Sequence, residues 1–293
     1  MREKVLILSN ITALIVLFTS CSHTSGKSRS LKIDNEPFPL DSSITIIGQP
    51  KSEEYGSLII KKPIDSSILK CKPLQSSNTP EQFLEKSSFI ASYNQQTRCP
   101  NWVAWQLTAE HADGPYKRMN NFHEEEDVPE PRATLQDYRS SGWSRGHMCP
   151  AGDNKWSYDA MYDSFSLVNV CPQDSKLNSG LWNSIEMDCR KWARKYGAIY
   201  IVCGPVWMKG EHRSIGENEV LVPEAFFKVV LCLAGKPKAF GFIVRNTEGN
   251  KKRDMYYNSV DQVERITGFD FFPALPDDIE NEVEAEANIN DWR

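Results

Sequence analysis

The sequence predicts one domain of the α+β class over residues 85–276. Three observations support this prediction: six segments are rich in β-branched and aromatic residues, two have helical character, and no internal repeat is present. The strand-like segments come in runs with few helices between them, as in α+β proteins.

The predicted strands share short apolar runs bounded by turn residues. They are 88–94, 102–110, 165–170, 198–204, 225–234 and 239–246. The tetrapeptide 235–238, Gly-Lys-Pro-Lys, separates the last two and is a plausible hairpin turn.

Two helices are predicted, at 178–197 and 259–266. In the second, Ser259 and Gln262 have the spacing of a capping box, and Gly268 provides a stop. The first begins at Asn178, a residue type that often caps helices.

Composition and net charge limit the classes of protein to which the chain can belong. The chain has 293 residues, of which 40% are hydrophobic and 25% charged, so a globular protein is expected. The net charge is −5, but residues 277–293 hold seven acids and one arginine, which indicates a solvated acidic tail. The rest is close to neutral, so a polyanion would need a local basic patch.

The N-terminal residues 1–20 have the layout of a signal peptide, with Arg2 and Lys4 before an apolar run. The run ends at Cys21 in a segment similar to a bacterial lipobox, although Phe18 is an imperfect match. We expect a lipidated Cys21, a tether and lead-in over 21–84, and export to the periplasm or cell surface. An ordinary cleaved signal and secretion, or an uncleaved anchor, are the alternatives.

Seven further cysteines follow Cys21, an odd number that cannot all pair within one chain. They contain no CxxC spacing, which argues against a structural zinc site. Cys203 and Cys232 lie in apolar strand-like runs, where a free buried cysteine acts as a small hydrophobic residue.

The stretch GWSRGHMCPAGDN, residues 142–154, places Arg145 and His147 on either side of a single glycine. One interpretation is a surface loop with an exposed histidine. The other is a general base beside a phosphate-binding arginine, with Gly146 keeping a tight turn. The three letters alone do not decide between them.

The helix over 178–197 carries a second candidate site. Asn178, Trp182 and Glu186 recur every four residues and share a face. Individually they could be a cap, a core residue and a solvated carboxylate. Together, Asn178 and Glu186 could hold a well-hydrated Mg²⁺. The opposite face is expected to be a solvated surface, with a track for DNA as the alternative. It carries four basic residues, namely Arg190, Lys191, Arg194 and Lys195.

The order of these pieces resembles a known family. Arg118 is followed by the run from Arg132 to Gln173, which contains SRGHMCPAGDN and ends in SLVNVCPQ, and then by LNSGLWNSIE. This order is similar to the non-specific DNA/RNA endonucleases of the ββα-metal, or His-Me finger, group. The resemblance covers roughly 85–280 and implies a ββα-metal core on a mainly antiparallel sheet with flanking helices.

The resemblance also implies roles for individual residues. His147 would be the general base, and Arg118 and Arg145 would bind the phosphate and its transition-state charge. Asn178 would be the one direct ligand of Mg²⁺, for which Mn²⁺ could substitute, and Glu186 would hold metal-bound waters. The implied partners are DNA and RNA, recognised through the phosphate backbone.

Three further positions complete the comparison. Asn169 and Gln173 match positions that support the site and the substrate. Ser144 departs from the family pattern, which usually has aspartate there, so reduced or shifted activity is expected at worst.

Two other functions are compatible with parts of the sequence. A surface lipoprotein of the same fold could bind nucleic acid with weak or no cleavage. A cysteine hydrolase could pair His147 with Cys149, although no acyl-transfer signature surrounds them. The sequence leaves open the preference for DNA or RNA, the disulfide pairing and the oligomeric state, a homodimer included.

Overall fold

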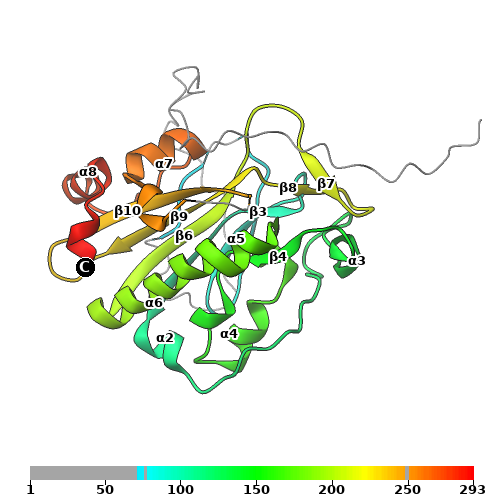
Figure 1. The fold of residues 1–293 in the computed structure, drawn as a ribbon, viewed down its shortest axis with the longest axis horizontal. Coiled ribbons are helices and arrows are strands. Elements are labelled where there is room, and N and C mark those ends of the chain that lie inside the picture. Colours follow the sequence, from blue (N-terminus) through cyan, green and yellow to red (C-terminus); the bar gives the residue numbers. More distant parts are fainter. Residues whose placement is uncertain (1–70, 76–77, 248–250) are drawn as a thin grey trace, which may run out of the picture. The chain divides into compact units, whose positions relative to one another are not determined.

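A seven-stranded antiparallel sheet forms the centre of the computed structural model, which describes residues 71–75, 78–247 and 251–293 (Figure 1). The strand order is β1-β2-β3-β6-β9-β10-β11. Their bounds are β1 Gln82–Glu85, β2 Ile90–Asn94, β3 Cys99–Thr108, β6 Ala198–Val206, β9 Ala225–Cys232, β10 Lys238–Arg245 and β11 Tyr257–Asn258. The α+β class and the mainly antiparallel sheet are thus confirmed.

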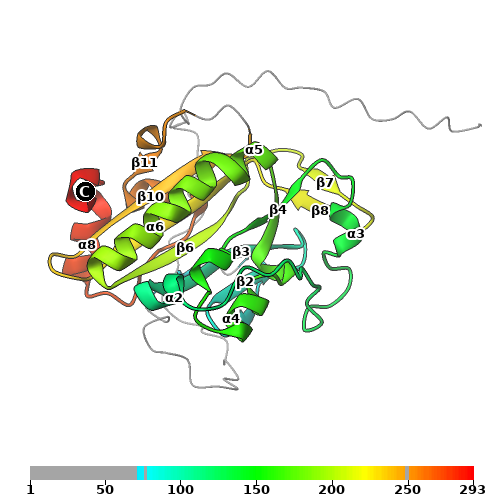
Figure 2. The same cartoon turned by 60° about the horizontal axis from the view of Figure 1, so that its bottom comes forward.

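The sheet is covered on both faces, which explains why β9 is buried along its whole length. Successive strand residues point to opposite faces. Phe226 therefore packs in the apolar cluster beneath α6 (Asn183–Tyr196), whereas Phe227 packs in a second cluster with α7 (Val260–Thr267) and α8 (Asp277–Ala285). Figure 2 shows α6 lying along the sheet.

Two short ribbons and several short helices lie beside the sheet. The ribbons pair β4 (Ser144–His147) with β5 (Val170–Gln173) and β7 (Arg213–Ile215) with β8 (Val220–Val222). The other helices are α2 Ala109–Asp113, α3 Leu135–Tyr138, α4 Tyr158–Asp163 and α5 Ser175–Leu177, and 3₁₀ turns span Ala151–Asp153, Leu167–Asn169, Arg253–Met255 and Ile289–Trp292. Among the described helices, none combines the length and apolar character needed to cross a membrane.

Local hydrogen bonds at the ends of elements explain where the observed boundaries agree with the predicted ones and where they differ. Helix α7 has the predicted capping box, with Gln262 N donating to Ser259 Oγ, and it ends at Gly268 in a left-handed conformation. The strand predicted over 102–110 ends at Thr108, because that side chain accepts a hydrogen bond from His111 N and starts α2. The strand predicted over 165–170 is mostly a 3₁₀ turn that leads into β5.

The helix predicted over 178–197 starts earlier and is not regular. Asp174 caps it, accepting hydrogen bonds from Lys176 N and Leu177 N, so Asn178 is not a cap. A π-helical turn, Asn178–Trp182, joins α5 to α6. Such turns are rare and occur often at functional sites.

The segment 277–293 is not the solvated acidic tail that its charge indicates. Its acids flank two buried apolar residues, Val283 and Trp292. The Trp292 ring packs against Trp192 of α6 and Phe240 of β10, with centroids 5.1 and 4.9 Å apart. At the other end, β1 begins before residue 85, so the sheet includes part of the predicted lead-in. The signal peptide and the lipidation site lie outside the described residues.

The seven cysteines from Cys71 to Cys232 are all buried. The six from Cys99 onward have free thiols, which agrees with the expectation for Cys203 and Cys232. Burial also raises the pKa of Cys149 well above its usual range, helped by the nearby Asp153 carboxylate. A thiolate nucleophile at Cys149 is therefore disfavoured.

We predict that Trp292→Ala lowers the free energy of unfolding by about 3–5 kcal/mol, because it leaves a cavity between α6 and β10. Urea unfolding followed by fluorescence measures this change. Met255→Ala is the matched control, since this side chain is 55% exposed and its loss should cost less than about 0.5 kcal/mol. Equal losses in the two variants would mean that the C-terminal segment does not pack as described.

Candidate active site

The ribbon of β4 and β5 carries Arg145 and His147 on one strand. Arg145 lies opposite Pro172, and His147 lies opposite Val170. Being two residues apart in a strand, the two side chains point to the same face. Their spacing thus follows from strand geometry.

Gly146 is part of this strand and does not form the tight turn expected from the sequence. A Cβ atom at this position would lie 2.3 Å from Gln173 Oε1 and 2.5 Å from Gln173 Cβ. The glycine therefore makes room for the buried Gln173 side chain between the two strands. Neither amide atom of Gln173 has a hydrogen-bond partner among the described residues.

His147 lies in an aromatic pocket. Its ring is 5.1 Å from the centroids of both Phe122 and Phe165, and the residue is 6% exposed. Burial, together with the charges of Arg118 and Arg145, lowers the pKa of His147 to about 3. The imidazole is therefore neutral near pH 7, and no described residue forms a hydrogen bond with its Nε2 atom.

The two arginines sit against the same aromatic pair. The Arg145 guanidinium is 4.3 Å from the Phe122 ring centroid, and that of Arg118 is 5.3 Å from Phe165. Both arginines line a cavity of about 870 Å³ together with Asn178. The cavity wall also includes Phe122, Glu124, Leu135, Gln136, Tyr138, Arg139, Trp143 and Ser144. Its guanidinium groups and apolar surfaces suit a phosphate flanked by sugar and base.

Glu186 lies in the first turn of α6, and its side chain is 13% exposed. Burial raises the pKa of Glu186 to about 7, although nearby Lys228, Arg190 and Arg118 act to lower it. Arg118 therefore influences both Glu186 and His147. The amide oxygen of Asn178 and the carboxylate of Glu186 are hard oxygen donors, so their chemistry fits a Mg²⁺ ion that keeps most of its waters.

Beneath Glu186 lies a buried charge network that the sequence analysis did not find. Arg190 Nη1 donates to Asp153 Oδ1 at 2.8 Å and lies 4.0 Å from Glu186 Oε2. Trp105 Nε1 donates to the other Asp153 oxygen at 3.2 Å. Arg190 thus faces inward with Glu186, and its assignment to a solvated face is wrong. The i, i+4 spacing of Glu186 and Arg190 is the sequence signal that could have shown it.

Lys228 is the second missed cation, and it is 1% exposed. Its Nζ atom lies 4.8 and 4.9 Å from the ring centroids of Trp105 and Trp182 and donates to Met148 O at 3.4 Å. A lone lysine in the otherwise apolar run of β9 is the signal for it. The charge partly offsets the two buried carboxylates nearby.

Asn169 holds the chain that follows His147. Its Oδ1 atom accepts from Cys149 N at 2.8 Å, and its Nδ2 atom donates to Cys149 O and Ser164 O. The residue is fully buried, so its side chain supports the site without reaching the cavity.

Ser144 marks the departure from the family pattern. Its hydroxyl lies 2.7 Å from the hydroxyl of Ser175, which joins the start of β4 to α5. The serine thus keeps a local link but supplies no carboxylate.

The antiparallel sheet, the ribbon that carries His147 and the helical segment that carries Asn178 match the ββα-metal fold. The family model for DNA/RNA non-specific endonucleases matches residues 71–278, and the chain belongs to this family. This confirms the resemblance that the sequence motifs indicate.

Several relatives share this region. The mitochondrial nuclease EXOG of Danio rerio is 38% identical over 207 residues, covering 64% of this chain and 60% of the relative. Mitochondrial endonuclease G of Bos taurus is 33% identical over 209 residues, covering 66% and 70%. Nuclease C1 of Cunninghamella echinulata var. echinulata is 35% identical over 214 residues, covering 67% and 85%. The match thus spans less than two thirds of the EXOG length.

The fold also matches a solved structure, that of the EndoG/EndoGI complex, which describes the mechanism of EndoG inhibition. The TM-score is 0.64 at 26% identity, covering 67% of this chain and 88% of the matched one.

We predict that His147 makes the protein less stable in acid. The folded-state pKa is depressed to about 3, so between roughly pH 6.5 and pH 3 the unfolded chain binds a proton that the folded chain does not. The stability contribution is present above the unfolded pKa and is lost as the pH falls. Between pH 7 and pH 5 the loss should be about 2 kcal/mol.

Urea unfolding of the parent and His147→Gln at both pH values, in chelator, measures this contribution. All other groups titrate in both proteins, so the difference between their pH slopes isolates His147. Parallel slopes would show that His147 is not buried as a neutral imidazole.

Proposed function

We propose that the protein is a metal-dependent, sequence-non-specific endonuclease that hydrolyses phosphodiester bonds of DNA and RNA. The observation that carries the proposal is a neutral imidazole, without a partner for its Nε2 atom among the described residues, beside two arginines that line a cavity together with Asn178. The family membership of residues 71–278 supports the same reaction class.

His147 would act as the general base. Its neutral imidazole can accept a proton from an attacking water, and the free Nε2 atom is a suitable acceptor. A phosphate bound between Arg118 and Arg145 would offset the charges that hold the pKa of His147 down, so the imidazole becomes a stronger base when substrate is present.

Arg118 and Arg145 would hold the phosphate and stabilise the charge that grows on its oxygens. Their stacking on Phe165 and Phe122 fixes the guanidinium planes before substrate binds. Arginine contacts with the backbone carry no base information, which supports non-specific recognition of either nucleic acid.

Asn178 would bind Mg²⁺ directly, and Glu186 would hold waters of its shell, with Mn²⁺ as a substitute. The bound ion supplies Lewis acidity and an acidic water for the departing oxygen. Glu186 would serve in its ionised form, since the positive charge of the ion favours the carboxylate. Arg190 and Lys228 keep that carboxylate oriented when it is charged.

The test compares two variants on plasmid DNA and on RNA. His147→Ala removes the base and keeps the arginines, so substrate should still bind while cleavage falls by roughly 10²–10⁴. Asn178→Ala should cleave slowly and recover partly at higher Mg²⁺, because mass action refills a weakened site.

His212→Ala is the matched control, because His212 pairs with Glu224 and is not part of the assigned site. This variant should cut as fast as the parent. The assigned site is wrong if His147→Ala and Asn178→Ala also cut at the parent rate. A parent protein that binds DNA but does not cut in Mg²⁺ or Mn²⁺ would instead favour a nucleic-acid-binding lipoprotein, with Ser144 the first residue to restore to aspartate.

We also propose that the protein is exported and anchored to a membrane through a lipid on Cys21. The support is the sequence pattern of a basic start, an apolar run and a lipobox-like end. A Ser-rich tether would then hold the nuclease domain away from the membrane.

Cys21→Ser should release the protein into the soluble fraction or stall its processing, because no thiol remains to be acylated. Detergent partitioning and metabolic labelling with a fatty acid measure the change. Unchanged partitioning of the variant would point to an uncleaved apolar anchor.

A further inference from the structure

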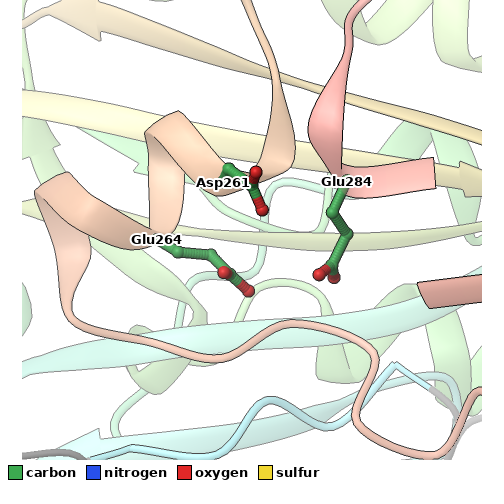
Figure 3. A group of neighbouring side chains, drawn as sticks. All are labelled: Asp261, Glu264 and Glu284. Carbon is green, nitrogen blue, oxygen red and sulfur yellow. The ribbon is translucent and has the colours of Figure 1, made fainter. Parts of the chain in front are cut away.

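Helices α7 and α8 bring three carboxylates together on the sheet face opposite α6. Asp261 and Glu264 come from successive turns of α7, and Glu284 comes from α8 (Figure 3). One carboxylate oxygen of each lies within 4.8 Å of the others. All three side chains point into the space between the two helices (Figure 3).

No cation balances this group among the residues that the structure describes. Two further acids, Asp270 and Glu280, lie close enough to raise the pKa of Glu284. The one ion pair of α8 in the described chain joins Glu282 to Lys236 on the exposed side of the helix. The group therefore gathers negative charge without a protein counter-ion.

Glu284 gives an independent indication of a missing partner. The residue is 7% exposed, and its Oε1 atom has no hydrogen-bond partner in the part of the chain that the structure describes. Burial together with neighbouring Glu264 raises the pKa of Glu284 to about 9, and burial raises that of Glu264 to about 7. A buried, unpaired carboxylate is costly, so a partner is expected.

Glu264 is held ready for such a partner. Its Oε1 atom accepts a hydrogen bond from Phe271 N at 2.7 Å, which fixes the carboxylate and leaves Oε2 available. Asp261 lies in the first turn of the same helix, on the side that faces α8 (Figure 3).

We propose that Asp261, Glu264 and Glu284 bind one Ca²⁺ ion that joins α7 to α8, separate from the catalytic metal. Ca²⁺ binds six to eight oxygens at about 2.3–2.6 Å, so ligand oxygens on opposite sides of one ion lie about 4.6–5.2 Å apart. The three carboxylate oxygens lie within 4.8 Å of one another, so all three can reach one ion of this size. Mg²⁺ demands a tighter octahedron and is the weaker candidate.

The ion would stabilise the layer that covers the far face of the sheet. Helices α7 and α8 both pack against β10, and Val263 and Val283 are buried there. Joining the two helices through carboxylates fastens the C-terminal segment without any contact with the catalytic residues.

The test measures Ca²⁺ binding by calorimetry in the full chain carrying Asn178→Ala, which weakens the catalytic metal site. We expect one Ca²⁺ per chain, and a rise in the unfolding midpoint of roughly 5–10 °C at a hundredfold excess over the dissociation constant. Adding Glu284→Gln should abolish both effects. Adding Glu282→Gln, the matched control on the exposed side of α8, should preserve them.

The unfolding midpoint in chelator shows whether the variant is folded. There, Glu284→Gln should be at least as stable as its parent, because the amide has nearly the size of the carboxyl group and cannot ionise beside the other acids. Two outcomes overturn the proposal. One is that Glu284→Gln binds Ca²⁺ as its parent does. The other is that the unfolding midpoint of the parent rises when the pH is lowered but not when Ca²⁺ is added, which would mean that the carboxylates share protons.

Discussion

The ion pair between Asp153 and Arg190 connects the parts from which the site is built. Asp153 lies in the 3₁₀ turn that follows strand β4 of the ribbon, and Arg190 lies on α6. Trp105 of the central sheet donates a hydrogen bond to the second carboxylate oxygen of Asp153. Both charges are largely removed from water. In such a buried environment, a well-paired contact is strongly favoured over either charge alone. The pair therefore fixes the distance between the strand that carries His147 and the helix that carries Glu186.

Burial acts on the two titrating residues of the site in opposite directions. It lowers the pKa of His147 and raises that of Glu186, so both groups are biased toward their uncharged forms. In the proposed function, a bound phosphate would raise the basicity of His147, and a bound cation would favour the charged form of Glu186. Each residue would then reach its working protonation state through the group that the site binds.

Much of the fold could be predicted because the signals are local. The strands of the sheet are apolar runs, and α7 carries its capping box and its glycine stop in the sequence. The candidate residues were found because Arg145, His147, Asn178 and Glu186 keep a recognisable order.

The missed features depend on contacts between distant segments. Arg190 turns inward because Asp153 lies there, and Trp292 is buried because α6 and β10 offer it a pocket. Gly146 is required by the Gln173 side chain of the neighbouring strand. The i, i+4 spacing of Glu186 and Arg190 is the one local signal among them. The partners Asp153, Phe240 and Gln173 lie far away in sequence, so neither periodicity nor charge pattern could indicate them.

The six free thiols from Cys99 to Cys232 set a condition on how the chain can mature. In the folded protein all six are buried and so shielded from oxidants, and among them the side chains of Cys99 and Cys171 are in contact. In a nascent chain they are all accessible, and any crosslink formed then would lock segments that belong in separate strands. In an oxidising compartment, the yield of active protein would therefore depend on whether the sheet folds faster than non-native disulfides form.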